Sequence, residues 1–169
     1  MNFTGLAFLD PFDLAASLRG PRMGLFRAPD DEPPPLTCPV RWRGDGGNGD
    51  KWVVRSKWPE LTIYIQQIKQ LSGQAGAVDF GNIDMEMLPA GTGMNWEWWE
   101  GGGYEHAIVM LRTNPGFRLF AGDEVWVPAI GFITAVNRRV PRSAINMGET
   151  PAIWLALDYR KRPVTGEPE

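Results

Sequence analysis

The sequence has very few of the residues that build disulfide scaffolds and metal sites. Its 169 residues include one cysteine, Cys38, and one histidine, His106. A lone cysteine cannot form a disulfide within the chain, and a lone histidine cannot supply a multi-histidine metal site. The two counts exclude disulfide-stapled folds, zinc ribbons and most zinc enzymes. A catalytic triad of serine, histidine and aspartate would depend on His106.

Long apolar runs and an excess of positive charge are also missing. No run approaches the roughly 18 apolar residues of a membrane-spanning helix. The 17 Lys and Arg face 20 Asp and Glu, so the formal net charge is -3, and neither nucleic acid nor a membrane is an expected partner. The N-terminus carries Asp10 and Asp13 among its apolar residues and lacks the basic start of a signal peptide. We therefore expect a cytoplasmic protein.

Glycine and proline are abundant, with 20 and 15 residues, which favours turns and short strands over a helical bundle. One helix is expected at residues 58–71, where Leu61, Tyr64, Ile65 and Ile68 follow helical spacing. Strands are predicted at residues 83–87, 106–112, 117–120, 124–127, 132–136, 143–146 and 152–159. Short strands with turn signals every 8 to 12 residues or so are typical of a sandwich or jelly roll.

These signals predict a mainly β protein with a double-stranded β-helix, or jelly roll, at residues 52–162 and one packed helix. Residues 1–51 are expected to form an extended, proline- and glycine-rich N-terminal arm, and residues 163–169 a C-terminal tail. The arm has too many apolar residues for a solvated tail. We expect it to pack on its own domain or on another subunit through Phe3, Phe8 and Phe12.

Several short motifs occur in order along the second half of the chain. They are Leu88-Pro89-Ala90-Gly91, Thr113-Asn114-Pro115-Gly116, Gly122-Asp123-Glu124, Asn137-Arg138-Arg139 with Ser143-Ala144-Ile145-Asn146, and residues 155–159 (LALDY). Their order and spacing resemble the aspartyl/asparaginyl β-hydroxylase-like branch of the 2-oxoglutarate oxygenases, over about residues 60–160. The resemblance implies a jelly roll whose mouth holds Fe(II) and 2-oxoglutarate.

The chain departs from that family at the positions where the resemblance implies metal ligands and a residue that binds the co-substrate. Such a site needs imidazole and carboxylate ligands and a cation for the distal carboxylate of 2-oxoglutarate. The positions implied for histidine hold Ile108 and Arg142, and Pro151 and Ala152 stand where the binding arginine would open the last strand. We therefore expect no metal and no cofactor.

His106 leaves an alternative open. It lies two residues before Ile108, so in a strand the two side chains share a face. A non-standard iron site would combine His106 with Glu97 or Glu100, and Arg112 or Arg142 would hold the 2-oxoglutarate. In the other interpretation, His106 is a half-buried strand residue with one hydrogen-bond partner.

Arg142 argues against a metal, because a guanidinium repels a divalent cation and cannot become a ligand. We expect it to pair with an acid such as Glu97, Glu100 or Glu105, or to bind an anion.

The densest aromatic cluster is formed by Trp96, Trp98 and Trp99. These tryptophans form either a contact surface or part of a filled jelly-roll core. The sequence thus predicts a non-catalytic, oxygenase-like jelly roll that serves as a binding or structural subunit. Its expected partners are proteins in a homo- or hetero-oligomeric assembly, for example a virion. The alternative is an Fe(II)/2-oxoglutarate-dependent hydroxylase with non-standard ligands.

Overall fold

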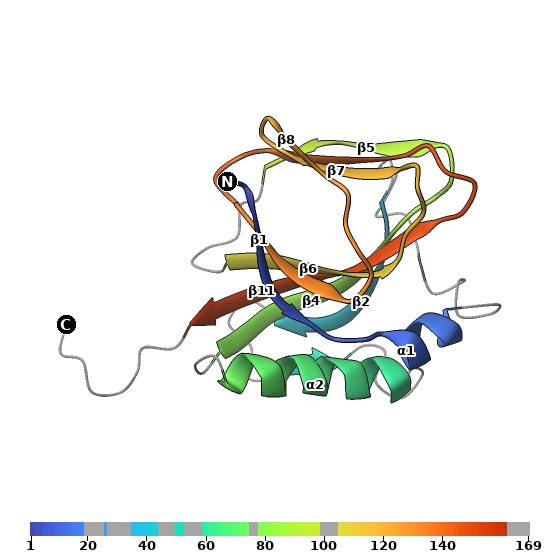
Figure 1. Ribbon diagram of the computed structural model, residues 1–169. Coiled ribbons are helices and arrows are strands. Elements are labelled where there is room, and N and C mark those ends of the chain that lie inside the picture. Colours follow the sequence, from blue (N-terminus) through green and yellow to red (C-terminus); the bar gives the residue numbers. More distant parts are fainter. Residues whose placement is uncertain are drawn as a thin grey trace.

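The computed structural model describes residues 1–18, 26, 35–43, 50–52, 59–74, 78–98 and 105–161. Two antiparallel β-sheets face each other, and helix α2 (Pro59–Gln74) lies along the outer face of the larger sheet (Figure 1). The other elements are β1 (Phe3–Phe8), α1 (Phe12–Ser17), β2 (Leu36–Arg43), β3 (Asp50–Trp52), β4 (Val78–Leu88), β5 (Thr92–Glu97), β6 (Glu105–Arg112), β7 (Phe117–Ala121), β8 (Glu124–Trp126), β9 (Phe132–Val136), β10 (Arg142–Asn146) and β11 (Ala152–Lys161). The predicted mainly β, jelly-roll architecture is confirmed.

The larger sheet has seven strands in the order β1-β9-β6-β11-β4-β2-β3, and the smaller has four in the order β5-β10-β7-β8. From β4 to β11 the chain passes back and forth between the two sheets, which is the jelly-roll connection. The predicted strands of this part are all present. Strand β5 was not predicted, because Pro89, Gly91 and Gly93 are turn-forming residues that lie before it or within its first residues.

Both faces of the larger sheet are covered, so alternate residues of its strands enter two different cores. On β6, Ala107 and Val109 face the core under the helices, while Ile108 and Met110 face the core between the sheets. This explains why β6 is apolar along its whole length rather than alternating. The core between the sheets is where the candidate site begins.

Helix α2 extends three residues beyond the predicted end at residue 71. Its apolar stripe is buried against the larger sheet, with Leu61, Tyr64, Ile65 and Ile68 each at most 3% exposed. Burial of each such side chain contributes roughly 1.5–3 kcal/mol. Glu60 in the first turn favours the helix through its dipole. No helix within the described residues is both long and apolar enough to cross a membrane.

The N-terminal segment packs on its own chain, which is one of the two arrangements expected for it. Strand β1 pairs with β9, and β2 pairs with β4, so both belong to the larger sheet. Helix α1 begins where the Asp10 carboxylate accepts the Phe12 backbone N–H at 3.0 Å, and Leu14 and Leu18 are buried beside α2. Strands β1, β2 and β3 were not predicted, because their apolar residues do not alternate regularly.

Candidate functional site

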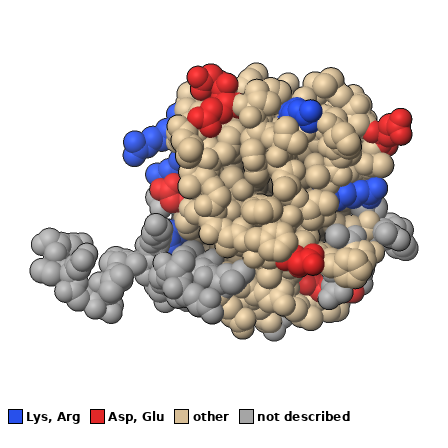
Figure 2. Space-filling model, viewed as in Figure 1, with Lys and Arg blue, Asp and Glu red and all other residues tan. Residues whose placement is uncertain are grey.

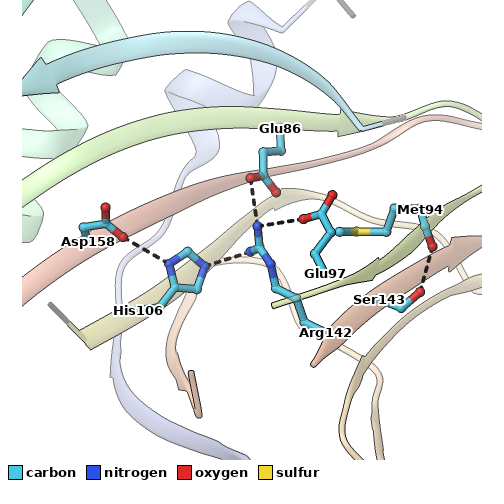
Figure 3. Close-up of polar contacts among 7 residues, drawn as sticks. All are labelled: Glu86, Met94, Glu97, His106, Arg142, Ser143 and Asp158. Carbon is cyan, nitrogen blue, oxygen red and sulfur yellow. Dashed lines mark hydrogen bonds and ion pairs between the residues drawn. The ribbon is translucent and has the colours of Figure 1, made fainter. Parts of the chain in front are cut away.

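A group of charged side chains meets at one end of the space between the sheets (Figure 3). The larger sheet contributes Glu86 from β4, His106 from β6 and Asp158 from β11. The smaller sheet contributes Glu97 at the end of β5 and Arg142 at the start of β10, which lie opposite each other in the strand register. Sheet pairing therefore brings together residues from five strands, and we call these five side chains the charged cluster.

Arg142 is the centre of this cluster. One guanidinium nitrogen, Nη1, lies 2.9 Å from Nε2 of His106. The other, Nη2, lies 3.5 Å from Oε1 of Glu86 and 3.5 Å from Oε2 of Glu97. The predicted pairing of Arg142 with Glu97 is therefore present. Arg142 bridges the sheets, with one carboxylate partner on each.

The position of Arg142 fixes the protonation of His106. A guanidinium only donates hydrogen bonds, so Nε2 of His106 must accept one. Nδ1 then carries the proton and faces Oδ1 of Asp158 at 3.4 Å. Burial, followed by the charge of Arg142, lowers the pKa of His106 to about 3. The imidazole is neutral at physiological pH, and Arg142 is the cation of the cluster.

Two carboxyl groups near this end have pKa values above the ordinary value. Burial, and then the negative charges of Glu86 and Asp158, raise the pKa of Asp84 to about 7, while Arg142 acts in the opposite direction. Burial raises the pKa of Asp158 to about 6, against the lowering effects of Arg142 and of a backbone hydrogen bond from Asn82. Burial is the main cause of both shifts, and the charge of Arg142 lowers both pKa values without offsetting it.

The opposite end of the same space is built from uncharged groups. The side-chain amide of Asn146 donates to the carbonyl oxygens of Leu88 at 3.0 Å, Pro89 at 3.2 Å and Thr150 at 2.9 Å. Its oxygen accepts from the Asn114 amide at 2.9 Å. Three of the motifs that carry the family resemblance thus meet here, where they hold turns together.

The strands between these two ends leave little free space. A cavity beside Arg142, Ser143 and Trp154 has a volume of about 10 Å³, which is enough for about one water molecule. Ile108 and Trp154 are 2% and 1% exposed and help to fill the interior.

Comparisons with known proteins identify the fold. No family model matches the chain, and no curated protein matches it. A prolyl-4-hydroxylase from Pseudomonas putida is similar over 96% of this chain and 94% of its own, with 16% identity and a TM-score of 0.59. A viral collagen prolyl hydroxylase from Paramecium Bursaria Chlorella virus-1 covers 96% and 97%, with 9% identity and a TM-score of 0.58.

A 2OG-Fe(II) oxygenase-family oxidoreductase from Burkholderia pseudomallei is similar over 75% of this chain and 68% of its own, with 11% identity and a TM-score of 0.56. The fold is that of the 2-oxoglutarate/Fe(II) oxygenases. At such low identity the likeness concerns the fold, and the chemistry depends on the residues at the site.

The oxygenase fold implies Fe(II) and 2-oxoglutarate, but the charged cluster does not fit them. No three His, Cys, Asp or Glu side chains of the described ranges come together as a metal-binding group. The Nε2 lone pair that His106 would offer to iron accepts a hydrogen bond from Arg142 instead. A guanidinium among the acids also repels a divalent cation. The side chains of the cluster are therefore arranged for ion pairing rather than for holding iron.

The other predicted site residues lie apart from the cluster or outside the described residues. Ile108 shares the inward face with His106, as expected, but it is part of the apolar core. Arg112 follows His106 by six residues on β6, which places it about 20 Å away along the strand. Glu100 is outside the described residues.

Asp84, Glu86 and Asp158 were not predicted as site residues from the sequence. The alternation of Asp84 and Glu86 with Ile83, Met85 and Met87 indicates a strand but not which face of it is covered. The smaller sheet covers the face that carries the two acids, so Glu86 is 6% exposed. Asp158 could have been identified from the sequence as an acidic residue within the apolar run of the last strand.

The predicted interface residues fall into two groups. Phe3 packs toward the core between the sheets and stacks on Trp126, with ring centroids 5.1 Å apart. The exposed group consists of Phe8, Phe12, Trp96 and Trp98, at 55%, 73%, 55% and 66%. Trp99 lies outside the described residues.

Proposed function

We propose that this protein is a binding or structural subunit built on the oxygenase fold, in which Arg142 closes the mouth of the jelly roll. The observation that carries the proposal is the 2.9 Å contact between Nη1 of Arg142 and Nε2 of His106. It engages the one imidazole of the chain and puts a positive charge among the carboxylates. The filled interior supports the same proposal.

A subunit role needs protein partners, and exposed aromatic and aliphatic side chains are suited to bind them. The exposed side chains of Trp96, Trp98 and Phe8 are examples. Jelly rolls serve as shell modules in virus particles, so a virion or a cytoplasmic complex is the setting that we propose.

Metal loading combined with turnover tests this proposal directly. The purified chain is incubated with Fe(II) under anaerobic conditions, separated from free metal and analysed for bound iron. The same preparation receives 2-oxoglutarate and oxygen, and succinate is measured. We expect no stoichiometric iron and no succinate above the level of the buffer control.

The matched variant is His106→Ala, because it removes the imidazole on which an iron site would depend. Stoichiometric iron that is lost in His106→Ala, together with consumption of 2-oxoglutarate, would overturn the proposal. The protein would then be a hydroxylase with non-standard ligands.

A further inference from the structure

One side of the molecule carries a broad surface without charged side chains. Figure 2 views this side, and Lys, Arg, Asp and Glu of the described residues show only toward its rim. We call it the apolar face and define it by five residues that are 44–58% exposed: Leu6, Phe8, Val127, Ile130 and Phe132. An exposed apolar surface of this kind on a folded domain marks an interaction site.

The apolar face contains a groove with a volume of about 300 Å³, visible as a hollow near the middle of Figure 2. Phe3, Trp126 and Phe132 line it with aromatic rings, and Gly5 leaves part of it open. Phe8 and Phe132 form a ring pair on the neighbouring strands, with centroids 5.1 Å apart. The groove can therefore take apolar side chains from a partner but offers no charged group to hold them.

One edge strand of each sheet contributes to the groove, because Phe3 and Gly5 belong to β1 and Trp126 belongs to β8. Strand β1 ends the seven-stranded sheet and β8 ends the four-stranded sheet. In Figure 1, β1 runs along the front of the molecule. Its six residues, FTGLAF, contain no charge and no proline. Natural edge strands are normally protected by charges, prolines or a covering element, since their free backbone groups recruit another strand.

We infer that the apolar face binds a second copy of this chain, with β1 of one protomer antiparallel to β1 of the other. Within the described residues no strand pairs with the outer edge of β1, so a partner can add a strand there, although the Phe3 N–H already donates to the Glu124 carboxylate. The absence of charge requires a partner surface that is equally uncharged, because a charged partner would lose its hydration and gain no opposite charge. The apolar face of another copy offers both a strand and an uncharged surface and brings no like-charge repulsion.

A two-fold axis beside β1 makes this contact self-complementary and closed. The same residues then serve on both sides, and Leu6, Phe8 and Val127 of each protomer become covered. The inference deepens the proposed function, on which it rests for a subunit role, by naming the partner and the surface.

Oligomeric state as a function of concentration tests the inference. Light scattering or sedimentation is measured for the full chain and for Leu6→Lys, which places a charge on the edge strand. We expect a wild-type dimer and at least a tenfold weaker dimer for the variant. Val127→Glu is a second variant, on the connection after β8, where no strand pairing is disturbed, and it is expected to act in the same direction.

Met147→Lys is the matched control, because Met147 is also an exposed apolar residue but follows β10, an inner strand of the smaller sheet. We expect it to leave the dimer unchanged, and circular dichroism checks that all variants are folded. A wild-type chain that is monomeric up to its solubility limit would overturn the inference. So would a dimer that Met147→Lys weakens as much as Leu6→Lys. Neither outcome bears on iron binding, which the metal test measures separately.

Discussion

Strand β10 begins at Arg142 and ends at Asn146, and the two ends of this strand lie in polar networks of different kinds. At Asn146, uncharged amides hold the turns before β5, β7 and β11. At Arg142, a cation is surrounded by carboxylates and a neutral imidazole. Three of the motifs that resemble the oxygenase family lie at the first end, whereas Arg142, which stands where the resemblance implies a histidine, lies at the second. The turn-forming residues at the Asn146 end therefore indicate the fold. Whether the site can bind a metal depends on the residues at the Arg142 end.

Removal of the Arg142 cation is expected to cause the largest loss of stability at the charged end of β10. Arg142→Ala leaves the buried carboxylate of Glu86 without the guanidinium, and the loss of one partner of a buried ion pair costs about 3–5 kcal/mol. We expect urea unfolding to show a decrease of this size at pH 7. Arg139→Ala, which alters an exposed residue on the preceding turn, is the control and is expected to change stability by less than about 0.5 kcal/mol.

A double variant without either charge shows whether the stability lost in Arg142→Ala comes from the charge or from the packing of Arg142. In Arg142→Met with Glu86→Gln, both charges are gone and similar volume remains. We expect the double variant to recover most of the stability that Arg142→Ala loses. If Arg142→Ala is as stable as the wild type, the cluster does not depend on its cation and the picture of Arg142 as a closure is wrong.

The uncharged end is expected to respond in a different way. Asn146→Ala leaves the Leu88 and Pro89 carbonyl oxygens without their amide donor, and each unsatisfied buried group costs about 1–3 kcal/mol. We expect a total loss of about 2–4 kcal/mol that does not change between pH 5 and 8, since no titrating group is involved. A loss of stability that depends strongly on pH would contradict the conclusion that uncharged groups hold the turns together at this end.

The fold was largely predictable because it depends on periodicity and turn chemistry that neighbouring residues display. The helix around Leu61 and Ile65 and the strand around Val109 are examples. Strand β1 was not predictable, because its place at the sheet edge depends on pairing with β9, about 130 residues later. The same holds for Glu86: its burial depends on the smaller sheet, which the local pattern does not reveal. Arg142 was found because the resemblance implies a histidine at its position. His106 was found because it is the one histidine of the chain and shares a strand face with Ile108.

Asp84 gives the charged end a pH dependence. Its folded pKa of about 7 exceeds the ordinary value of 3.8, so the folded state binds more protons between these values and loses stability as the pH rises through them. His106 acts in the opposite direction, because its lowered pKa removes stability as the pH falls from 6.5 toward 3. Both Asp84→Asn and the wild type contain His106, so its contribution cancels when their free energies of unfolding are subtracted.

We therefore expect Asp84→Asn to gain stability over the wild type as the pH rises from 5 to 8, on the order of 2 kcal/mol. Urea unfolding of both proteins at several pH values measures this difference. The exposed variant Asp123→Asn is the control and is expected to show no such trend. A constant difference across the range would mean that Asp84 ionises in the folded protein as easily as in the unfolded chain.

The smallest effect is expected at the outer rim of the charged end. Glu97 is the more exposed carboxylate partner of Arg142, with 44% of its side chain accessible against 8% for Glu86, although both distances to Nη2 are 3.5 Å. Water and salt screen the outer pair, so Glu97→Gln is expected to cost less than about 1 kcal/mol, and less still at high salt. Glu86→Gln removes the inner charge and is expected to change stability more, with little dependence on salt. Unfolding of the two variants at low and high ionic strength measures the contrast. Equal effects with equal salt dependence would mean that the two carboxylates share one environment, and that Arg142 lies at an open surface rather than closing the jelly roll.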